Sequence, residues 1–174
     1  MDLKAVIGAI VDSYAPMAAA EGVTLSADLP EERYLAAGDH NSFSVLFDNL
    51  IVNGIKYNRP GGTVVVRAER TRGRLIISVA DTGMGVADAD VPFLFDEFFR
   101  GGERGGKKTS GTGLGLPICK RIVNELGGRI EVESKAGVGS VFRVELPAES
   151  RKGNGGGNVG EAGARAPGNG AAGR

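Results

Sequence analysis

The sequence predicts an α+β fold, a two-layer sandwich in which about three helices cover one face of a mixed, mostly antiparallel sheet. Three segments repeat apolar residues at the helical period, and several shorter runs are rich in β-branched residues, as strands are. Turn-forming residues at Thr71–Arg74 and Ala136–Gly139 join neighbouring runs into hairpins, whose strands are antiparallel. Helices grouped beside hairpins in this way are typical of a two-layer architecture.

The first two helices are predicted from their apolar spacing and their boundary residues. The first is expected over residues 3–20, where Pro16 is expected to bend the helix or to end its regular part. The second is expected to begin after Asp39, a typical N-cap residue, and to end before the helix-breaking residues Arg59–Gly62. Each helix therefore has one apolar face that can pack on a sheet.

The third helix is expected to start near Leu114 and to end at the glycine pair Gly127–Gly128. Pro117 is compatible with this helix because proline is accepted in the first turn. The residues between the helices are β-rich, and residues 23–29 alternate apolar and polar side chains, as a half-buried strand does. The expected strands are residues 23–29, 33–37, 63–68, 75–79, 129–134 and 140–146.

Length and composition indicate one cytosol-compatible domain followed by a tail. The 174 residues carry no net formal charge, which gives no support for broad binding to nucleic acids or membrane surfaces. Cys119 is the lone cysteine, so an intramolecular disulfide is excluded, and no apolar run is expected to span a membrane. Residues 1–147 are assigned to the domain. Residues 148–174 have almost no large apolar side chain and are expected to be a disordered Gly/Ala-rich tail.

A polar stripe on the second helix suits a metal-bound phosphate. Asn49, Asn53 and Lys56 are spaced i, i+4 and i+7, which places them on one helix face. A carboxamide oxygen is a hard, neutral ligand of the kind that Mg²⁺ accepts, and a lysine neutralises phosphate charge. Three such residues alone are more typical of a solvated helix face, so other motifs have to support the functional interpretation.

Asp81 follows an apolar strand and precedes two glycines. A carboxylate in this place can accept a hydrogen bond from an exocyclic amine such as adenine N6, and Gly83 and Gly85 let backbone approach a ring closely. The alternative is an ordinary turn, because aspartate and glycine are common in turns. Apolar residues that could flank a flat ring, or that simply belong to the core, are Val86, Leu114, Leu116 and Phe142.

A second glycine-rich run opens the third helix. The backbone amides of Gly111, Thr112, Gly113, Leu114, Gly115 and Leu116 are expected at the helix N-terminus, which is a favourable place for a di- or triphosphate. The run is neither a Walker-type loop nor a dinucleotide-binding fingerprint. The preceding residues 100–110 include Lys107 and Lys108 among glycines, and they are expected to be a mobile basic segment that closes over phosphates, or an ordinary surface loop.

Five motifs, in one order and spacing over residues 1–147, resemble those of bacterial sensor histidine kinases. They are similar to the N, G1, F and G2 boxes and the final Gly-x-Gly-Thr-x-Phe motif of that family. The matching segments, in chain order, are Asn49–Tyr57, Asp81–Gly85, Phe95–Arg100, Gly111–Leu116 and Gly137–Phe142. The resemblance implies the ATP-binding catalytic domain of a two-component kinase, within the superfamily of gyrase, chaperone and mismatch-repair ATPases.

The resemblance also implies cofactors and residue roles. ATP and Mg²⁺ would be bound, with Asn53 as the metal ligand and Asp81 as the residue that recognises adenine. Asn49 and Lys56 would lie near the phosphates, and Tyr57 would pack beside the nucleotide. Arg100, Lys107 and Lys108 would belong to a lid, one end of which Phe95, Phe98 and Phe99 would anchor. Asn53, Lys56 and Arg100 are accordingly the candidate catalytic residues, and Ser140 and Phe142 complete the candidate nucleotide site.

Three departures from the family pattern are visible. Gly54 replaces the usual alanine, which costs some helix stability, and Ser140 replaces threonine but keeps the hydroxyl of a water-linked adenine contact. His40 is the lone histidine and is expected to be a capping or surface residue. The third departure is the absence of a phosphoacceptor histidine, which is therefore expected on a separate dimerisation domain.

The expected function is to bind Mg-ATP and donate its γ-phosphate to that histidine, with a response regulator downstream. The isolated chain is expected to be a cytoplasmic monomer without nucleic-acid or membrane contact, and its parent a homodimer that could be anchored in a membrane. Two alternatives remain open. One is a serine kinase of the anti-sigma-factor type, and the other is a nucleotide-responsive interaction module without catalysis.

Overall fold

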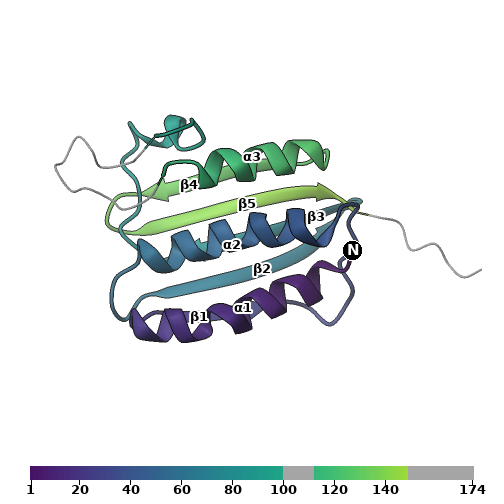
Figure 1. Cartoon of the computed structure of the whole chain (residues 1–174), viewed down its shortest axis with the longest axis horizontal. Coiled ribbons are helices and arrows are strands. Elements are labelled where there is room, and N and C mark those ends of the chain that lie inside the picture. The colour runs from purple at the N-terminus through teal and green to yellow at the C-terminus, as the bar shows by residue number, and fades with distance from the viewer. Residues whose placement is uncertain (100–111, 149–174) are drawn as a thin grey trace, which may run out of the picture.

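A computed structural model describes residues 1–99 and 112–148 of the chain. It is a two-layer structure in which three helices lie on one face of a five-stranded sheet (Figure 1). The elements in chain order are α1 (Leu3–Ala20), β1 (Thr24–Asp28), α2 (His40–Lys56), β2 (Thr63–Thr71), β3 (Arg74–Asp81), the 3₁₀ turn η1 (Val91–Phe93), α3 (Gly115–Glu125), β4 (Arg129–Lys135) and β5 (Gly139–Pro147).

The strand order is β1-β2-β3-β5-β4, so chain neighbours β3 and β4 are separated by β5. The pair β1–β2 is parallel and the other three pairs are antiparallel. Helix α2 connects the parallel pair, because antiparallel strands can be joined by a tight turn but parallel ones need a crossover. The predicted fold class, a mixed and mostly antiparallel sheet under one helical layer, is confirmed.

The core lies between the helices and the inner face of the sheet. Alternate residues of β2 and β3 are buried there, as the two-residue period of a strand requires. From the helical side, Phe43, Leu46, Phe47 and Leu50 of α2 are fully buried. α2 is the central helix, because it packs against α1 on one side and α3 on the other.

Local signals place the ends of several elements where the sequence predicts them. The carboxylate of Asp39 accepts a hydrogen bond from the N–H of Ser42 at 2.9 Å and caps α2. Between β2 and β3, Arg72 and Gly73 both have positive φ, 45° and 78°, which is the conformation of a two-residue hairpin turn. Pro117 lies in the first turn of α3, as expected.

One expectation about local structure is wrong, and one of the two alternatives at Pro16 is excluded. Residues 33–37 form no strand; they make only isolated bridges, Asp2 to Leu35 and Ala36 to Ala148. The first helix covers the expected residues, and Pro16 does not end it, because α1 continues to Ala20. The proline lies on the exposed side of the helix, and so does Asp12, whose carbonyl lacks the usual N–H partner and can bond to water instead.

β1 is less buried than its alternating sequence predicts. Leu25 is its half-buried side chain, and the other four residues are exposed, because β1 is an edge strand.

At the other end of the chain, Ala148 belongs to the fold, since its N–H bonds to Gly73 O at 2.9 Å. The tail predicted beyond it lies outside the described residues.

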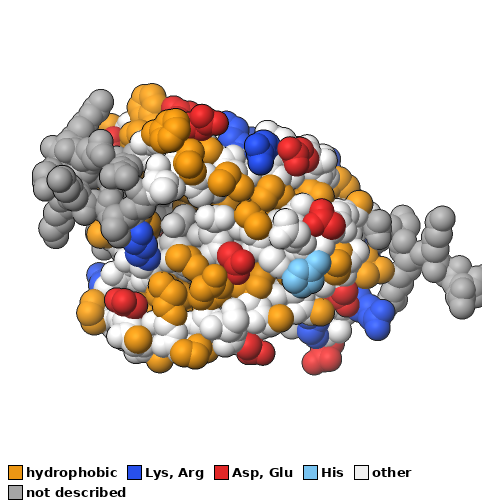
Figure 2. All heavy atoms as spheres, viewed as in Figure 1, with side chains coloured by type: hydrophobic (Ala, Val, Ile, Leu, Met, Phe, Trp, Pro, Cys, Tyr) orange, Lys and Arg blue, Asp and Glu red, His pale blue; other side chains and the backbone are white. Residues whose placement is uncertain are grey.

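The expectation about membrane-spanning length also needs correction. By length and composition alone, α1 is apolar enough to cross a membrane. Its position in the fold gives another reason for this composition, because Leu3, Ile7 and Ile10 are buried against the rest of the domain. Over the helical face drawn in Figure 2, acidic and basic side chains are interspersed among apolar ones.

Candidate functional site

The predicted site residues that the structure describes come from α2, the end of β3 and the loop after it, the start of α3, and β5. The end of α2, the start of α3 and this loop lie at the same end of the sheet (Figure 1). The loop bonds to Tyr57 just beyond α2, and Gly115 at the start of α3 approaches Asn49 of α2. Residues from three separate motifs therefore meet at one edge of the sandwich.

Asp81 ends β3 as a half-buried carboxylate on the helical side of the sheet. Its Oδ1 accepts a hydrogen bond from the N–H of Gly83 at 2.8 Å. Burial raises the pKa of this carboxyl, and hydrogen bonds from Gly83 and Ser140 partly oppose that rise. One carboxylate oxygen is thus fixed by the backbone, which sets the direction in which the other oxygen can accept a bond.

Three polar side chains form a row across neighbouring strands. Asp81 of β3 is paired with Ser140 of β5, and Ser140 is paired with Ser134 of β4. The Oγ atoms of the two serines are 2.9 Å apart. Ser140 is buried, with 8% of its surface exposed. The row crosses an inner face that is otherwise largely apolar, so its polar groups need hydrogen-bond partners within the protein.

The loop at residues 82–86 is fixed through its backbone. Four of its N–H groups donate hydrogen bonds to other parts of the protein. The bonded pairs are Thr82 N to Thr63 O at 3.1 Å, Gly83 N to Asp81 Oδ1 at 2.8 Å, Met84 N to Tyr57 O at 2.9 Å and Val86 N to Ser134 Oγ at 2.9 Å. Because these amides are already bonded, the loop is a preformed wall beside Asp81.

The glycines of this loop have a structural explanation that the sequence prediction did not include. A Cβ on Gly83 would overlap the carbonyl oxygen of Tyr57, and a Cβ on Gly85 would overlap that of Lys135. Gly85 also has a positive φ of 60°. Both glycines therefore let the loop pack against protein backbone, and this close packing accounts for them without any ring being present.

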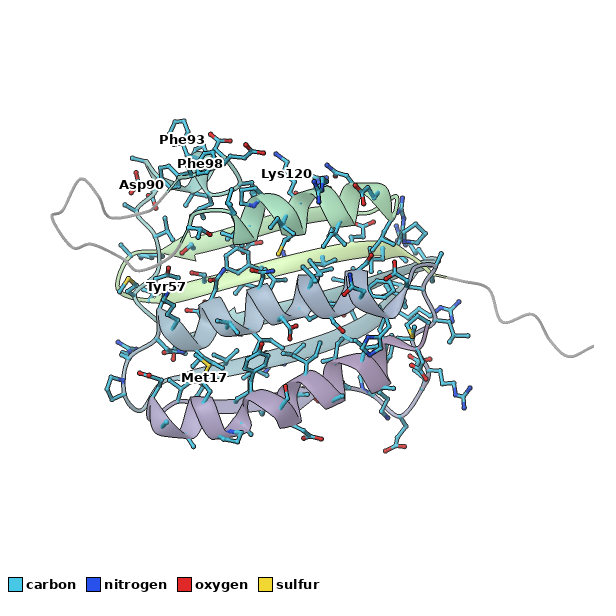
Figure 3. The ribbon with its side chains drawn as sticks, viewed as in Figure 1. Met17, Tyr57, Asp90, Phe93, Phe98 and Lys120 are labelled. Carbon is cyan, nitrogen blue, oxygen red and sulfur yellow. The ribbon has the colours of Figure 1, made fainter. Side chains whose placement is uncertain are left out.

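The polar stripe of α2 is present as predicted, with different surroundings for each member. Asn49 donates from Nδ2 to the carbonyl of Val45 at 2.7 Å, while its Oδ1 faces Gly115. Asn53 is half-buried, and its side chain makes no hydrogen bond within the described part of the chain. Lys56 Nζ lies 5.4 Å from the centre of the Tyr57 ring. Figure 3 labels Tyr57 at the end of α2.

The start of α3 is packed closely against two neighbours. Gly113 has a φ of 71°, and a Cβ there would lie 2.8 Å from the Phe98 backbone. A Cβ on Gly115 would lie 2.6 Å from Asn49 Oδ1. Among the described residues no side chain caps the helix at Leu114, so the N–H groups of the first turn can bind an anion.

The phenylalanines before the predicted lid do not behave alike. Phe95 is partly buried under Lys120, whose Nζ is 5.8 Å from the ring centre, and Phe99 packs against Phe93 with ring centres 5.9 Å apart. Phe98 is 69% exposed and contacts its surroundings by a backbone bond, N–H to Gly113 O at 3.0 Å. Figure 3 shows Phe93 and Phe98 together beside α3. Phe95 and Phe99 thus pack against neighbours and Phe98 does not, while the lid that they are expected to anchor lies outside the described residues.

The remaining candidates divide into three groups. Val86, Leu114 and Leu116 are half-buried beside the site, and Thr112 is exposed. Phe142 is buried in the core. The candidates that lie outside the described residues are Arg100, Lys107, Lys108 and Gly111.

Two polar residues of this region were missed by the sequence analysis. Ser134 bonds to the loop through Val86. Asn58 donates from Nδ2 to Gly54 O and Thr63 O, both at 3.0 Å, and thereby ties the end of α2 to the start of β2. A signal for Asn58 existed, since an asparagine before Arg-Pro-Gly-Gly is typical of a turn. Ser134, a lone serine in a strand, gives no such signal.

The donor atoms of the site suit a nucleotide better than a protein-only metal centre. Within residues 1–99 and 112–148, no group of three or more His, Cys, Asp or Glu side chains could hold a metal ion. A magnesium ion accepts a single carboxamide oxygen when phosphates and waters complete its shell, and the carboxamide of Asn53 fits that role. The site thus offers a carboxylate for an amine, helix-end amides for phosphate and one neutral ligand for a metal.

Comparison with known proteins agrees with this geometry. The family model of histidine kinase-, DNA gyrase B- and HSP90-like ATPases matches residues 38–150. The sensor histidine kinase RppB of Synechocystis is 34% identical over 145 residues, 83% of this chain and 32% of that protein. Sporulation kinase C of Bacillus subtilis is 41% identical over 113 residues, 65% of this chain and 25% of that protein. The chain thus spans a third or less of these curated relatives.

Solved structures agree on the fold, and the family model and the curated relatives assign the chain to its family. A mycobacterial sensor histidine kinase, MprB, superposes with a TM-score of 0.75 at 23% identity, covering 85% of this chain and 97% of that one. Full-length ShkA, solved in complex with AMPPNP, superposes with a TM-score of 0.74 at 27% identity, covering 85% and 30%. The chain belongs to the histidine kinase-, DNA gyrase B- and HSP90-like ATPase family, and within it to the ATP-binding catalytic domains of sensor histidine kinases.

Proposed function

We propose that this domain binds Mg-ATP and presents the γ-phosphate to a histidine on a separate dimerisation domain of the same kinase, with a response regulator as the next acceptor. The observation that carries the proposal is the meeting of Asp81, the Asn49–Asn53 face of α2 and the start of α3 at one end of the sheet. We place the domain in the cytoplasm, where ATP is available, and infer a homodimeric parent.

The proposed mechanism is one of positioning. Phosphoryl transfer has a loose transition state, so a catalytic domain contributes orientation and charge neutralisation more than covalent chemistry. Asp81 would accept a bond from the adenine amino group, and the first-turn amides of α3 would hold phosphate oxygens. Lys56 would add a positive charge near them, and Asn53 would hold the metal. When bound, Mg²⁺ would neutralise phosphate charge.

Transfer to histidine is tested with ATP labelled on its γ-phosphate. The domain is incubated alone and with a panel of histidine-containing helical hairpins from sensor kinases, and the stability of any label to acid is measured. We expect acid-labile label on a hairpin, because phosphohistidine hydrolyses in acid. Acid-stable label on a serine would favour the anti-sigma-type kinase. Tight ATP binding without transfer to any hairpin would favour a non-catalytic module.

The role of Asn53 is tested by Asn53→Ala in binding titrations with and without magnesium. We expect ATP affinity to fall at least about tenfold when Mg²⁺ is present and to change little in EDTA, because the carboxamide acts through the metal. Asn41→Ala is the matched control, since Asn41 is an exposed asparagine near the opposite end of the same helix. An equal loss with and without Mg²⁺ would remove Asn53 as the metal ligand.

A further inference from the structure

We propose that Ser134 is a positioning residue for recognition of the base: its hydroxyl connects the loop at residues 82–86 to the Ser140–Asp81 pair and so sets the selectivity for a 6-amino purine. The inference rests on the proposed function, in which Asp81 accepts a bond from the amino group. Ser134 lies outside all five sequence motifs and acts through its neighbours rather than on the nucleotide.

The Ser134 hydroxyl makes three contacts, which is the number that its one proton and two lone pairs allow. Its Oγ accepts a bond from the N–H of Val86 at 2.9 Å. The same atom is 2.9 Å from Ser140 Oγ and 3.1 Å from the carbonyl oxygen of Gly139. Through these three contacts Ser134, on β4, is joined both to the loop after β3 and to the first residues of β5.

Counting protons limits how this network can be arranged. A serine hydroxyl has one proton to donate and two lone pairs that accept. If Ser134 donates to Gly139, then Ser140 has to donate to Ser134, and its proton is no longer directed at Asp81. If Ser134 donates to Ser140, then Ser140 is able to donate to the Asp81 carboxylate. The carbonyl oxygen of Gly139 can only accept, so its 3.1 Å contact with Ser134 Oγ is a hydrogen bond in the first arrangement, in which Ser134 donates to Gly139 and Ser140 donates to Ser134.

In this arrangement Ser134 is the centre of the network. Its Oγ accepts from the Val86 N–H and from the Ser140 hydroxyl, and it donates to the Gly139 carbonyl. Asp81, the strand partner of Ser140, accepts from Gly83, which belongs to the same loop as Val86. Ser134 therefore acts on the carboxylate from two sides: it holds Ser140 beside Asp81, and it holds the loop whose amide binds Oδ1.

Loss of this hydroxyl should weaken the recognition of the 6-amino group more than the binding of the rest of the nucleotide. In Ser134→Ala the Val86 amide loses its acceptor and Ser140 loses its partner, so both the loop and the direction of Asp81 become less fixed. The proposed phosphate-binding groups lie on α2 and α3 and keep their own contacts. The expected signature is thus a loss of discrimination between purines rather than a uniform loss of affinity.

The experiment measures the affinities of the 174-residue protein for ATP and for purine riboside triphosphate, which lacks the 6-amino group, by calorimetry. For Ser134→Ala we expect ATP affinity to fall about tenfold and affinity for the analogue to change less than about twofold. Ser134→Thr restores the hydroxyl and should retain the preference for ATP. Ser134→Cys, a weaker donor and acceptor of similar size, should lie between, and it serves if the alanine variant does not fold.

Each outcome distinguishes this inference from the proposed function. Ser78→Ala is the matched control, because Ser78 is a half-buried serine on β3 whose side chain points to the opposite face of the sheet. If wild type does not prefer ATP over the analogue, recognition of the amine by Asp81 fails. If wild type prefers ATP and Ser134→Ala keeps that preference, or loses affinity for both nucleotides equally, the role of Ser134 is refuted while the proposed function stands.

Discussion

Asp81→Asn is expected to weaken ATP binding about 100-fold, as the loss of a buried, charge-assisted hydrogen bond would. The N–H of Gly83 donates to Oδ1, so the asparagine would place its carbonyl oxygen there and its NH₂ group at the position of Oδ2. A donor would then face the adenine amino group, which is also a donor. Inosine triphosphate, which has an acceptor oxygen at that position, should become the better ligand of the variant. Calorimetric titration with both nucleotides measures this change.

The pH dependence of binding gives an independent check of the same carboxyl. Burial raises its pKa in the folded protein, so the group protonates at a higher pH than an exposed aspartate does. Ionised Asp81 is the acceptor, and ATP affinity should therefore fall as pH drops through that raised pKa. The sign for folding is opposite: the contribution of this carboxyl to stability falls as pH rises from about 3.9 through the folded pKa. If Asp81→Asn binding shows the same pH dependence as wild type, Asp81 is not the group responsible.

Gly139→Ala is expected to be the most destabilising of the simple glycine substitutions at the site. Gly139 has a φ of 136°, which side chains rarely adopt, and a Cβ there would overlap the carbonyl oxygen of Asp81. That neighbour is strand backbone and cannot move without separating β3 from β5. We expect a loss of about 3 kcal/mol in the free energy of unfolding, measured by urea denaturation. ATP affinity should fall as well, because the shift moves Asp81.

Gly137→Ala is the control that separates the free-energy cost of a positive φ from the cost of the contact with Asp81. Gly137 lies in the same turn between β4 and β5 and has a φ of 77°, but a Cβ there would meet nothing within 4 Å. It should lose about 1 kcal/mol, the usual cost of a left-handed backbone for a residue with a side chain, with nucleotide binding unchanged. Equal losses in the two variants would show that the contact with Asp81 carries no cost of its own.

The location of the site could be predicted from the sequence for a physical reason. Helical and strand periods are local properties, so the three helices and five of the six expected strands follow from them. Glycines, capping residues and prolines then mark where those elements end. The resemblance of the motifs to those of sensor histidine kinases, in order and spacing, assigned Asp81 and the start of α3 to one candidate site, and the structure brings both to the same end of the sheet.

Contacts between distant segments could not be predicted in the same way. The strand expected at 33–37 has β-rich residues but finds only single bridge partners, because strand formation depends on an available neighbour. The glycines of the loop after β3 looked suited to a ligand, whereas their Cβ positions are filled by the backbone of Tyr57 and Lys135. Both results depend on which segments the fold brings together.

The sequence by itself determined the fold class and the family, since these are carried by local patterns and by motifs that keep their order, and it supplied the residues of the candidate site as a prediction. Only the tertiary structure decided how Asp81 is held. Ser134, Ser140 and Asp81 are on three different strands, and the order β3-β5-β4 makes them neighbours. A hydroxyl in a strand carries no sign of its partner, because hydrogen bonds across a sheet are set by strand order and register rather than by neighbours in the chain.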